Sequence, residues 1–222
     1  MTVKTALIVA AHPDDESIGM GGTWFSLLEN GWKLALVWMT DGESSRLGSV
    51  SDVRTFGYKD ALALLNPAAF YHFSFPDNAL DSVPLLSIIK ELEKVIEEVR
   101  PTVIYTHSPS DLNIDHRIVH EAVLTAARPL PESTVRTILG FEVLSATHWN
   151  GNTRFNPSWY VDITDYLTNK EALLDAYEGE MRPEPHARSK ACVMNLNRFR
   201  GGVMGQYACE AFELYRHLES TT

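Results

Sequence analysis

Short apolar runs alternate with amphipathic stretches along most of the chain. The run Ala6–Ala11 has no polar alternation, which is typical of a strand buried on both faces of a parallel sheet. The stretch Val83–Val99 instead repeats apolar residues at helical spacing. The pattern predicts strands at about 5–11, 33–39, 69–73, 102–106, 138–144 and 159–163, and helices ending at Gly31 and spanning 53–65, 83–99, 118–127 and 165–178. Such alternation predicts an α/β fold, Rossmann-like and doubly wound, around a mainly parallel sheet.

The alternation loosens beyond Ser145. A chain of 222 residues with 45% apolar content can bury one sizeable core, and no Ser/Gly/Pro-rich linker or repeat divides it. We therefore expect a single domain over residues 1–222. Its core would span 1–145, and an irregular C-terminal α+β extension over 146–222 would shape the substrate mouth.

Composition excludes several classes of partner. The formal net charge of −10 argues against nucleic acid, because phosphate neutralisation needs clustered Lys and Arg. No apolar run approaches the roughly twenty residues of a membrane span, and Met1–Thr5 does not resemble an export signal. Cys192 and Cys209 are too few for a disulfide framework or a thiolate metal site. We expect a cytoplasmic protein with a small-molecule partner, and the sequence leaves open whether it forms a homo-oligomer.

One imidazole and three carboxylates follow the first predicted strand, in the segment His12-Pro13-Asp14-Asp15-Glu16. Ligands of open α/β sheets bind at the carboxyl ends of strands, where these side chains would lie. Imidazole and carboxylate groups are also the usual nitrogen and oxygen ligands of catalytic zinc. The alternative is that the three acids only cap the following helix, whose first turn favours negative charge.

A second cluster, Thr106–Arg117, follows another apolar run, and its Asp115 and His116 fall at a predicted helix start. Asp115 and Asn113 would supply hydrogen bonds that orient His116 as a metal ligand. His120, four residues on, could share the same helix face. We expect His120 to be a solvated helix residue, because Arg stands where the zinc-protease pattern requires Glu.

Together the two clusters resemble the signature motifs of the PIG-L / LmbE-like N-deacetylases. Members of this family are zinc-dependent enzymes that remove acetyl groups from N-acetylated amino sugars and related conjugates. The similarity covers nearly the whole chain. It includes the segments Ala11–Glu16 with Gly19, Gly21 and Gly22, Thr40–Glu43, Phe75–Asp77, Asp111–Arg117 and Met181–Ser189.

Carried over residue by residue, the resemblance implies that His12, Asp15 and His116 bind zinc, or another divalent metal such as Fe²⁺. It makes Asp14 the general base, which fits a carboxylate placed to take a proton from the attacking water. The remaining expected roles are less direct. His186 and Arg188 would contact the oxyanion or the substrate. Arg46 and Arg54 would contact a phosphate or hydroxyls of the substrate, and surface ion pairs are the alternative for both. Glu16 would support the metal ligands or the start of the helix.

The chain departs from the family pattern at three places. Asn113 stands where many relatives have a histidine, and an amide can contact substrate but cannot carry a proton charge. Gly57 replaces a frequent glutamate, and Ala187 replaces a proline in the stretch Pro185–Ser189. These changes put the substrate in doubt more than the metal.

The sequence thus predicts a metal-dependent hydrolase that removes the N-acetyl group of a small amino-sugar compound. That compound could be an N-acetylglucosamine-type sugar, a sugar nucleotide, an antibiotic precursor or a thiol-sugar conjugate. Trp149, Trp159 and Tyr207 could stack on a sugar or base, or lie in the core. The alternative function is a Rossmann-like nucleotide-binding module without hydrolysis. Its glycine-rich loop would be Gly19–Thr23, but the third glycine of the fingerprint would fall on Trp24, so we expect these glycines to allow close helix packing.

Overall fold

Seven strands form one sheet, in the order β3-β2-β1-β4-β5-β7-β6. This computed structural model describes residues 4–40, 51–177 and 179–219, and for residues 51–57 it describes the backbone alone. β1 to β5 pair in parallel, and β7 runs antiparallel between β5 and β6. The strands are β1 Thr5–Ala10, β2 Lys33–Thr40, β3 Ala69–Phe75, β4 Val103–His107, β5 Thr137–Phe141, β6 Trp159–Asp162 and β7 Cys209–His217.

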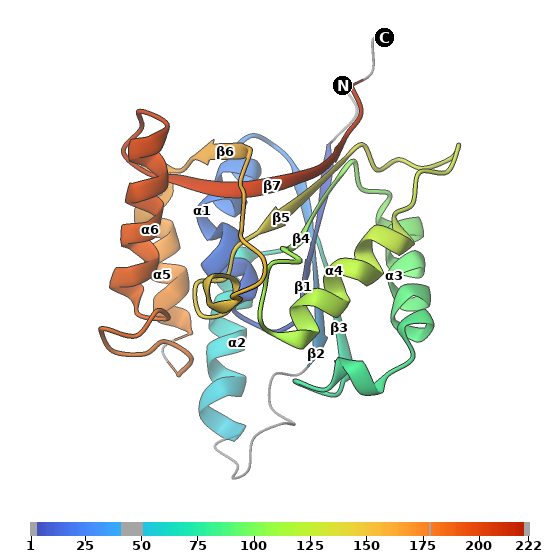
Figure 1. The fold of residues 1–222 in the computed structure, drawn as a ribbon, viewed down its shortest axis with the longest axis horizontal. Coiled ribbons are helices and arrows are strands. Elements are labelled where there is room, and N and C mark those ends of the chain that lie inside the picture. The colour runs from blue at the N-terminus through green and yellow to red at the C-terminus, as the bar shows by residue number, and fades with distance from the viewer. Residues whose placement is uncertain (1–3, 41–50, 178, 220–222) are drawn as a thin grey trace.

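Helices cover both faces of the sheet (Figure 1). The α-helices are α1 Asp15–Glu29, α2 Ser51–Leu65, α3 Leu85–Val99, α4 Ile114–Ala126, α5 Leu167–Ala176 and α6 Lys190–Val203. The described residues also form three short 3-10 helices, η1 Leu80–Ser82, η2 Thr147–Trp149 and η3 Thr164–Tyr166. Side chains of β1 alternate between two cores, because Leu7 and Val9 pack with α3 and α4 whereas Ala6 and Ile8 pack with α1, α2, α5 and α6.

The predicted α/β class and the mainly parallel sheet are confirmed. The helix expected at 118–127 begins earlier, at Ile114, and the last predicted helix becomes α-helical only at Leu167. The sequence pattern missed α6 and β7 altogether. Because β6 and β7 pair with each other and β7 pairs with β5, the part of the chain beyond residue 145 adds two strands to the same sheet.

Helix α1 is broken at Met20, whose φ and ψ of −149° and 23° are not helical. The carbonyl of Ile18 would otherwise accept from the amide of Gly22. Instead it accepts from Lys170 Nζ at 2.8 Å, and the Gly22 amide donates to Glu210 Oε1 at 2.9 Å. Lys170 and Glu210 form an ion pair of 2.5 Å, and both side chains are fully buried. The kink is therefore held by residues from α5 and β7.

Glycines let α1 approach its neighbours closely. A Cβ at Gly19 would lie 2.5 Å from Cδ2 of Phe141 in β5, and one at Gly22 would lie 2.8 Å from Cβ of Ile163. The predicted packing role of these glycines is confirmed. It also covers them with side chains, so they do not form an open phosphate-binding loop.

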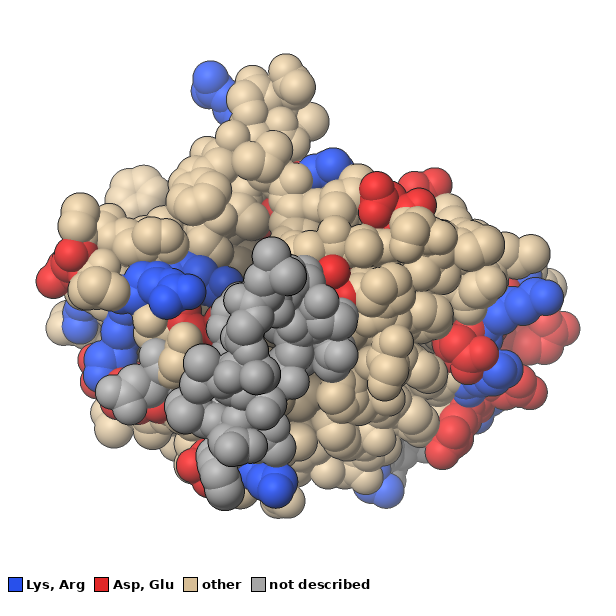
Figure 2. Space-filling model, turned by 90° about the horizontal axis from the view of Figure 1, so that it is seen from below, with Lys and Arg blue, Asp and Glu red and all other residues tan. Residues whose placement is uncertain are grey.

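The end of the molecule where β1 and β4 finish is viewed in Figure 2. On this face the Lys and Arg side chains drawn in blue lie among Asp and Glu side chains. Among the described helices, none is both long and apolar enough to cross a membrane.

Candidate metal and active site

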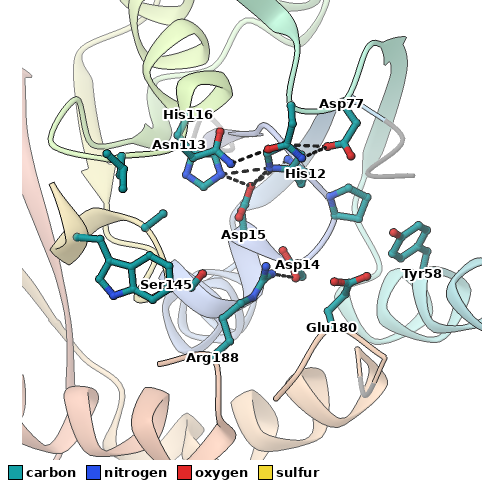
Figure 3. A pocket seen from close by; sticks show the side chains of 15 residues that line it. His12, Asp14, Asp15, Tyr58, Asp77, Asn113, His116, Ser145, Glu180 and Arg188 are labelled. Carbon is teal, nitrogen blue, oxygen red and sulfur yellow. Dashed lines mark hydrogen bonds and ion pairs between the residues drawn. The ribbon is translucent and has the colours of Figure 1, made fainter. Parts of the chain in front are cut away.

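Two strand ends meet at the site because β1 and β4 are parallel neighbours. The chain leaves β1 through His12 and enters α1 at Asp15. It leaves β4 at His107 and enters α4, whose first turn carries His116. Parallel neighbours end at the same edge of a sheet, so His12, Asp15 and His116 converge there (Figure 3).

Three ligand atoms form a nearly equilateral triangle. His12 Nδ1 lies 3.2 Å from Asp15 Oδ2 and 3.2 Å from His116 Nε2. The third side, from His116 Nε2 to Asp15 Oδ2, is 3.3 Å. The same Asp15 oxygen accepts the His12 backbone amide at 2.9 Å, which fixes the carboxylate relative to the turn.

The outer nitrogen of each imidazole faces carboxylates. His116 Nδ1 lies 2.9 Å from Asp111 Oδ2, and His12 Nε2 lies 3.1 Å from both Asp77 Oδ1 and Asp115 Oδ2. A proton on each outer nitrogen satisfies these contacts, which leaves a lone pair on each inner nitrogen. Carboxylate partners of this kind orient histidine ligands and raise their basicity.

With both imidazoles neutral, the triangle therefore brings together three acceptors, two nitrogens and a carboxylate oxygen. Tetrahedral zinc with bonds of about 2.0–2.1 Å spaces neighbouring ligand atoms about 3.3–3.4 Å apart. The observed sides of 3.2–3.3 Å fit that spacing. Two imidazoles and one carboxylate also leave a fourth position for water or substrate. The residues present fit a catalytic zinc ion.

The same groups favour positive charge at this point. Burial lowers the pKa of His116, but the charges of Asp15 and Asp111 outweigh it and raise this pKa to about 9. Burial alone would raise the pKa of Asp15, yet the charge of His116 holds it well below its usual range. The site therefore stabilises a cation, whether that is a proton or a metal ion.

Asp14 lies directly before the metal-ligand candidate Asp15. Its φ of 105° lies in the left-handed region, which is rare for a residue other than glycine. Asp14 is the residue directly before the first turn of α1. Its Oδ2 forms an ion pair with Arg188, and Oδ1 has no hydrogen-bond partner among the described residues. Burial raises the pKa of Asp14 to about 8, although the charge of Arg188 opposes the rise.

A cavity of about 350 Å³ opens beside the triad. Figure 3 shows Asp14 and Arg188 below the triad, Tyr58 and Glu180 on one side of the cavity and Ser145 on the other. Glu180 is buried, and its charge contributes to the raised pKa of Asp14. A small ligand in this cavity would touch both the triad and Asp14.

A family model described as PIG-L, GlcNAc-PI de-N-acetylase, matches residues 7–127, more than half of the chain. The chain belongs to the PIG-L family. YaiS of Escherichia coli (strain K12), named as an uncharacterized deacetylase, is 30% identical over 181 residues, 79% of this chain and 91% of YaiS. The resemblance that the two sequence motifs indicated is confirmed.

Two further proteins that resemble this chain carry different names. The diacetylchitobiose deacetylase of Thermococcus kodakarensis is 26% identical over 90% of this chain and 82% of its own length. The crystal structure of GalB, the 4-carboxy-2-hydroxymuconate hydratase of Pseudomonas putida KT2440, matches with a TM-score of 0.76 at 20% identity and covers 99% of both chains. The likeness to GalB shows the fold alone, so activity must be argued from the site.

Most of the predicted PIG-L site residues do come together. The cavity lining includes His12, Asp14, Asp15, Asn113, His116 and Arg188. Asn113 caps α4, because its Oδ1 accepts the Asp115 amide at 2.8 Å, and its Nδ2 donates to Asn78 Oδ1 at 3.2 Å. Both ends of this amide are thus engaged by the protein at the edge of the cavity.

The other three predicted residues are not part of the cavity lining that the structure describes. His186 is exposed, accepts the Arg188 amide on Nδ1 at 3.0 Å and does not line the cavity. Arg46 falls outside the described residues, as does the segment Asp41–Glu43. Arg54 belongs to α2, but its side chain is also outside the described part of the structure.

Glu16 lies behind the site and supports the start of α1. Its carboxylate accepts from Ser17 Oγ, from Trp38 Nε1 at 2.9 Å and from Tyr177 Oη at 3.1 Å. Burial raises its pKa. These contacts attach the first turn of α1 to β2 and to the end of α5.

Two details of the histidine assignment differ from expectation. Asp115 contacts His12 rather than its neighbour His116, and the partner of His116 is Asp111. The expectation that His120 is solvated is wrong, because His120 is 8% exposed and its Nδ1 lies 2.9 Å from the carbonyl of His107.

Sequence reasoning assigned no role to His107, the last residue of β4. This fully buried residue accepts the Ala11 amide on Nε2 at 2.9 Å, and its ring stacks on His116 with 3.9 Å between centroids. It thereby links the end of β1 to a metal-ligand candidate. Asp77 and Asp111 also had no assigned role, although both lie just beyond strands and their position at strand ends was a usable signal.

Proposed function

We propose that the protein is a zinc-dependent deacetylase that hydrolyses the acetamide group of a small N-acetylated amino sugar. Membership of the PIG-L family and the relatives named as deacetylases support this proposal. The observation that carries it is the triangle of His12 Nδ1, Asp15 Oδ2 and His116 Nε2, with Asp14 beside it in one cavity.

The three triangle atoms would hold the metal, and the same donor set also suits Fe²⁺. When bound, zinc supplies a Lewis acid that acidifies water and polarises an amide carbonyl. The Asp14 carboxylate accepts the proton that the attacking water loses. The resulting carboxylic acid then donates this proton to the amide nitrogen as the C–N bond breaks, which releases acetate and the amine.

Arg188 assists Asp14 in this scheme. Its guanidinium occupies Oδ2 of Asp14, so Oδ1 remains for the proton. A guanidinium has five N–H donors, so Arg188 can also hydrogen-bond the developing oxyanion. Asn113 cannot serve as an acid, and His186 would act only as a contact at the outer rim. Arg46 and Arg54 stay proposed contacts to substrate hydroxyls.

The charge of the described lining favours a neutral substrate. It contains the carboxylates of Asp14, Asp15, Asp77 and Glu180, and against these stand the guanidinium of Arg188 and the two positive charges of a bound zinc ion, so no excess positive charge is left to bind a polyanion. A polyanionic sugar nucleotide would meet more repulsion there than a neutral N-acetylglucosamine-type sugar. The alternative of a nucleotide-binding module is not favoured, because Gly19 and Gly22 are covered by packed side chains.

The test is acetate release by the zinc-loaded protein from N-acetylglucosamine, its β-1,4-linked disaccharide and the corresponding sugar nucleotide. Asp14→Asn should keep its zinc but lose about 10²–10⁴-fold in turnover, because the proton acceptor is gone. Asp81→Asn, which alters an exposed carboxylate on η1, is the matched control and should stay fully active. Full activity of Asp14→Asn, or absence of stoichiometric divalent metal from chelator-free protein, would contradict the proposal.

A further inference from the structure

Trp149 is the most exposed of the five tryptophans, with 55% of its surface accessible, yet it lines the same cavity as the triad. Trp24 and Trp38 are fully buried, and Trp159 is 37% exposed but does not belong to the cavity lining. An indole that keeps more than half of its surface in water, at the rim of a mostly polar cavity, gains little from folding. Its position therefore suits contact with a ligand.

Hydrogen bonds connect the segment that carries Trp149 to the candidate metal ligand His116. Trp149 ends the short helix η2, in which the buried Thr147 accepts the Val143 amide at 2.8 Å. The Thr147 hydroxyl donates to Asp111 Oδ2 at 2.9 Å, and the same oxygen lies 2.9 Å from His116 Nδ1. One carboxylate oxygen thus joins the segment of Trp149 to a metal-ligand candidate.

Two further contacts hold this segment in place. His148 Nε2 lies 2.8 Å from Glu142 Oε2, and Glu142 is bound by Arg200 of α6 through two nitrogens at 2.9 and 2.7 Å. The Leu112 amide donates to the Ala146 carbonyl at 3.2 Å, which joins the loop before α4 to the residues before η2. The rim is therefore preorganised rather than a free loop.

The cavity lining that includes Trp149 combines apolar and charged side chains. Leu112 and Ala146 line the cavity with it, and the ring of His186 stands edge-on to the indole at 6.1 Å between centroids. Asp14, Glu180 and Arg188 supply charge elsewhere in the lining. A pyranose ring matches this arrangement, because it presents C–H groups on its face and hydroxyls around its edge. An acyl chain would require a continuous apolar groove.

The size of the cavity places such a ring at the rim. A volume of about 350 Å³ is near the lower end of the range for ligand cavities, roughly 300–1,000 Å³. One acetamido ring at the triad would largely fill it. A second ring joined to the first would then lie outside, where Trp149 and Leu112 are half exposed.

We propose that Trp149 is a stacking platform for a second sugar ring, so that the substrate is an N-acetylated oligosaccharide with at least two rings rather than a free monosaccharide. This inference rests on the proposed function of the triad and Asp14. Trp149 determines specificity by contact with substrate, and Thr147 is the positioning residue that sets the platform relative to His116.

The experiment compares kcat/KM for N-acetylglucosamine and its β-1,4-linked disaccharide in the zinc-loaded wild type, Trp149→Ala, Trp149→Phe and the control Trp159→Ala. Wild type should prefer the disaccharide. Trp149→Ala should lose about tenfold on the disaccharide, mainly through KM, and nothing on the monosaccharide. Trp149→Phe should recover most of the loss, and Trp159→Ala should behave as wild type.

Equal losses on both sugars, or no loss on the disaccharide, would overturn the platform. Disaccharide binding to zinc-loaded Asp14→Asn, with and without Trp149→Ala, is measured by calorimetry to separate the two proposals. If wild type releases no acetate but binding still depends on Trp149, the deacetylase proposal fails and the platform stands. Binding that is insensitive to Trp149 overturns the platform whatever the activity.

Discussion

Helix α1 meets buried charge twice, at its first turn and at its kink, and the two clusters are balanced differently. At the kink, Lys170 donates to Ile18 and Glu210, and the Glu210 oxygens accept the amides of Gly22 and Thr23 at 2.9 and 2.6 Å. Each of these four donor groups has an acceptor. At the first turn, three atoms that can all act as acceptors face one another at 3.2–3.3 Å, and they have a donor among them only when a histidine carries a second proton.

The difference separates a structural cluster from a functional one. Burial and charge are common to both, so neither property identifies the site. What identifies it is that no described lysine or arginine is paired with the three converging atoms, so they are favourable together only around a positive charge supplied by a second histidine proton or by a metal ion. Stability of the kink should therefore be independent of metal, whereas stability of the first turn should depend on it.

The largest expected effect comes from breaking the kink pair. Lys170→Met leaves Glu210 buried without its cation and should lower the free energy of unfolding by about 3–5 kcal/mol. Urea denaturation measures this loss, which should be the same with zinc and with a chelator. The control Lys190→Met removes an exposed ion pair with Asp175 and should cost no more than about 1 kcal/mol. A comparably small loss in Lys170→Met would show that the pair does not hold the kink.

A smaller effect, and one that appears only with metal, is expected at the first turn. Free zinc at about 100 times its Kd should raise the wild-type free energy of unfolding by about 2.7 kcal/mol, and His116→Ala should gain nothing. His120→Ala is the matched control on the same helix, since His120 is outside the triad. It should keep the zinc-dependent gain even if its baseline stability falls. A zinc-dependent gain in His116→Ala would refute the assignment of this ligand.

The smallest effect is expected at Asp111, which contacts the ligand candidate His116 but is not itself one of the three triangle residues. Asp111→Asn removes the charge behind His116 but keeps an oxygen that can accept from Nδ1, so zinc affinity should fall by about tenfold. That fall corresponds to about 1.4 kcal/mol. Competition with a chelating dye at fixed pH measures the affinity, and Asp175→Asn serves as an exposed control. Unchanged affinity would mean that the bond from His116 to Asp111 does not tune the site.

Local pattern was sufficient for the part of the site that lies at strand ends. His12 and Asp15 come after β1, and His116 comes after β4 in the first turn of α4. Parallel strands end at one edge of the sheet. Their convergence therefore needed only the strand assignment. The same pattern places Asp77 and Asp111 at this edge, but which carboxylate faces which histidine was not predictable, because it depends on how the loops approach one another in three dimensions.

The missed elements α6 and β7 have physical reasons as well. The sequence of β7 has a charged residue, Glu210, at a position that is only 1% exposed in the structure. A charged residue at a buried position breaks the apolar pattern that predicts a strand inside a sheet. That glutamate is buried because Lys170 comes from a different element. α6 ends with two glycines, Gly201 and Gly202, which favour a loop by propensity. The error at His120 is similar, since a backbone carbonyl satisfies its ring in place of water.

The broken helix also orders events during synthesis. The Gly22 amide bonds a carboxylate 188 positions later, and the Ile18 carbonyl bonds an ammonium 152 positions later. At about 5–20 residues per second, the ribosome makes the first turn of α1 roughly ten to forty seconds before β7 exists. During that interval the first turn of α1 belongs to a helix whose kink is not yet secured. The kink is therefore completed late, when the C-terminal strand enters the sheet.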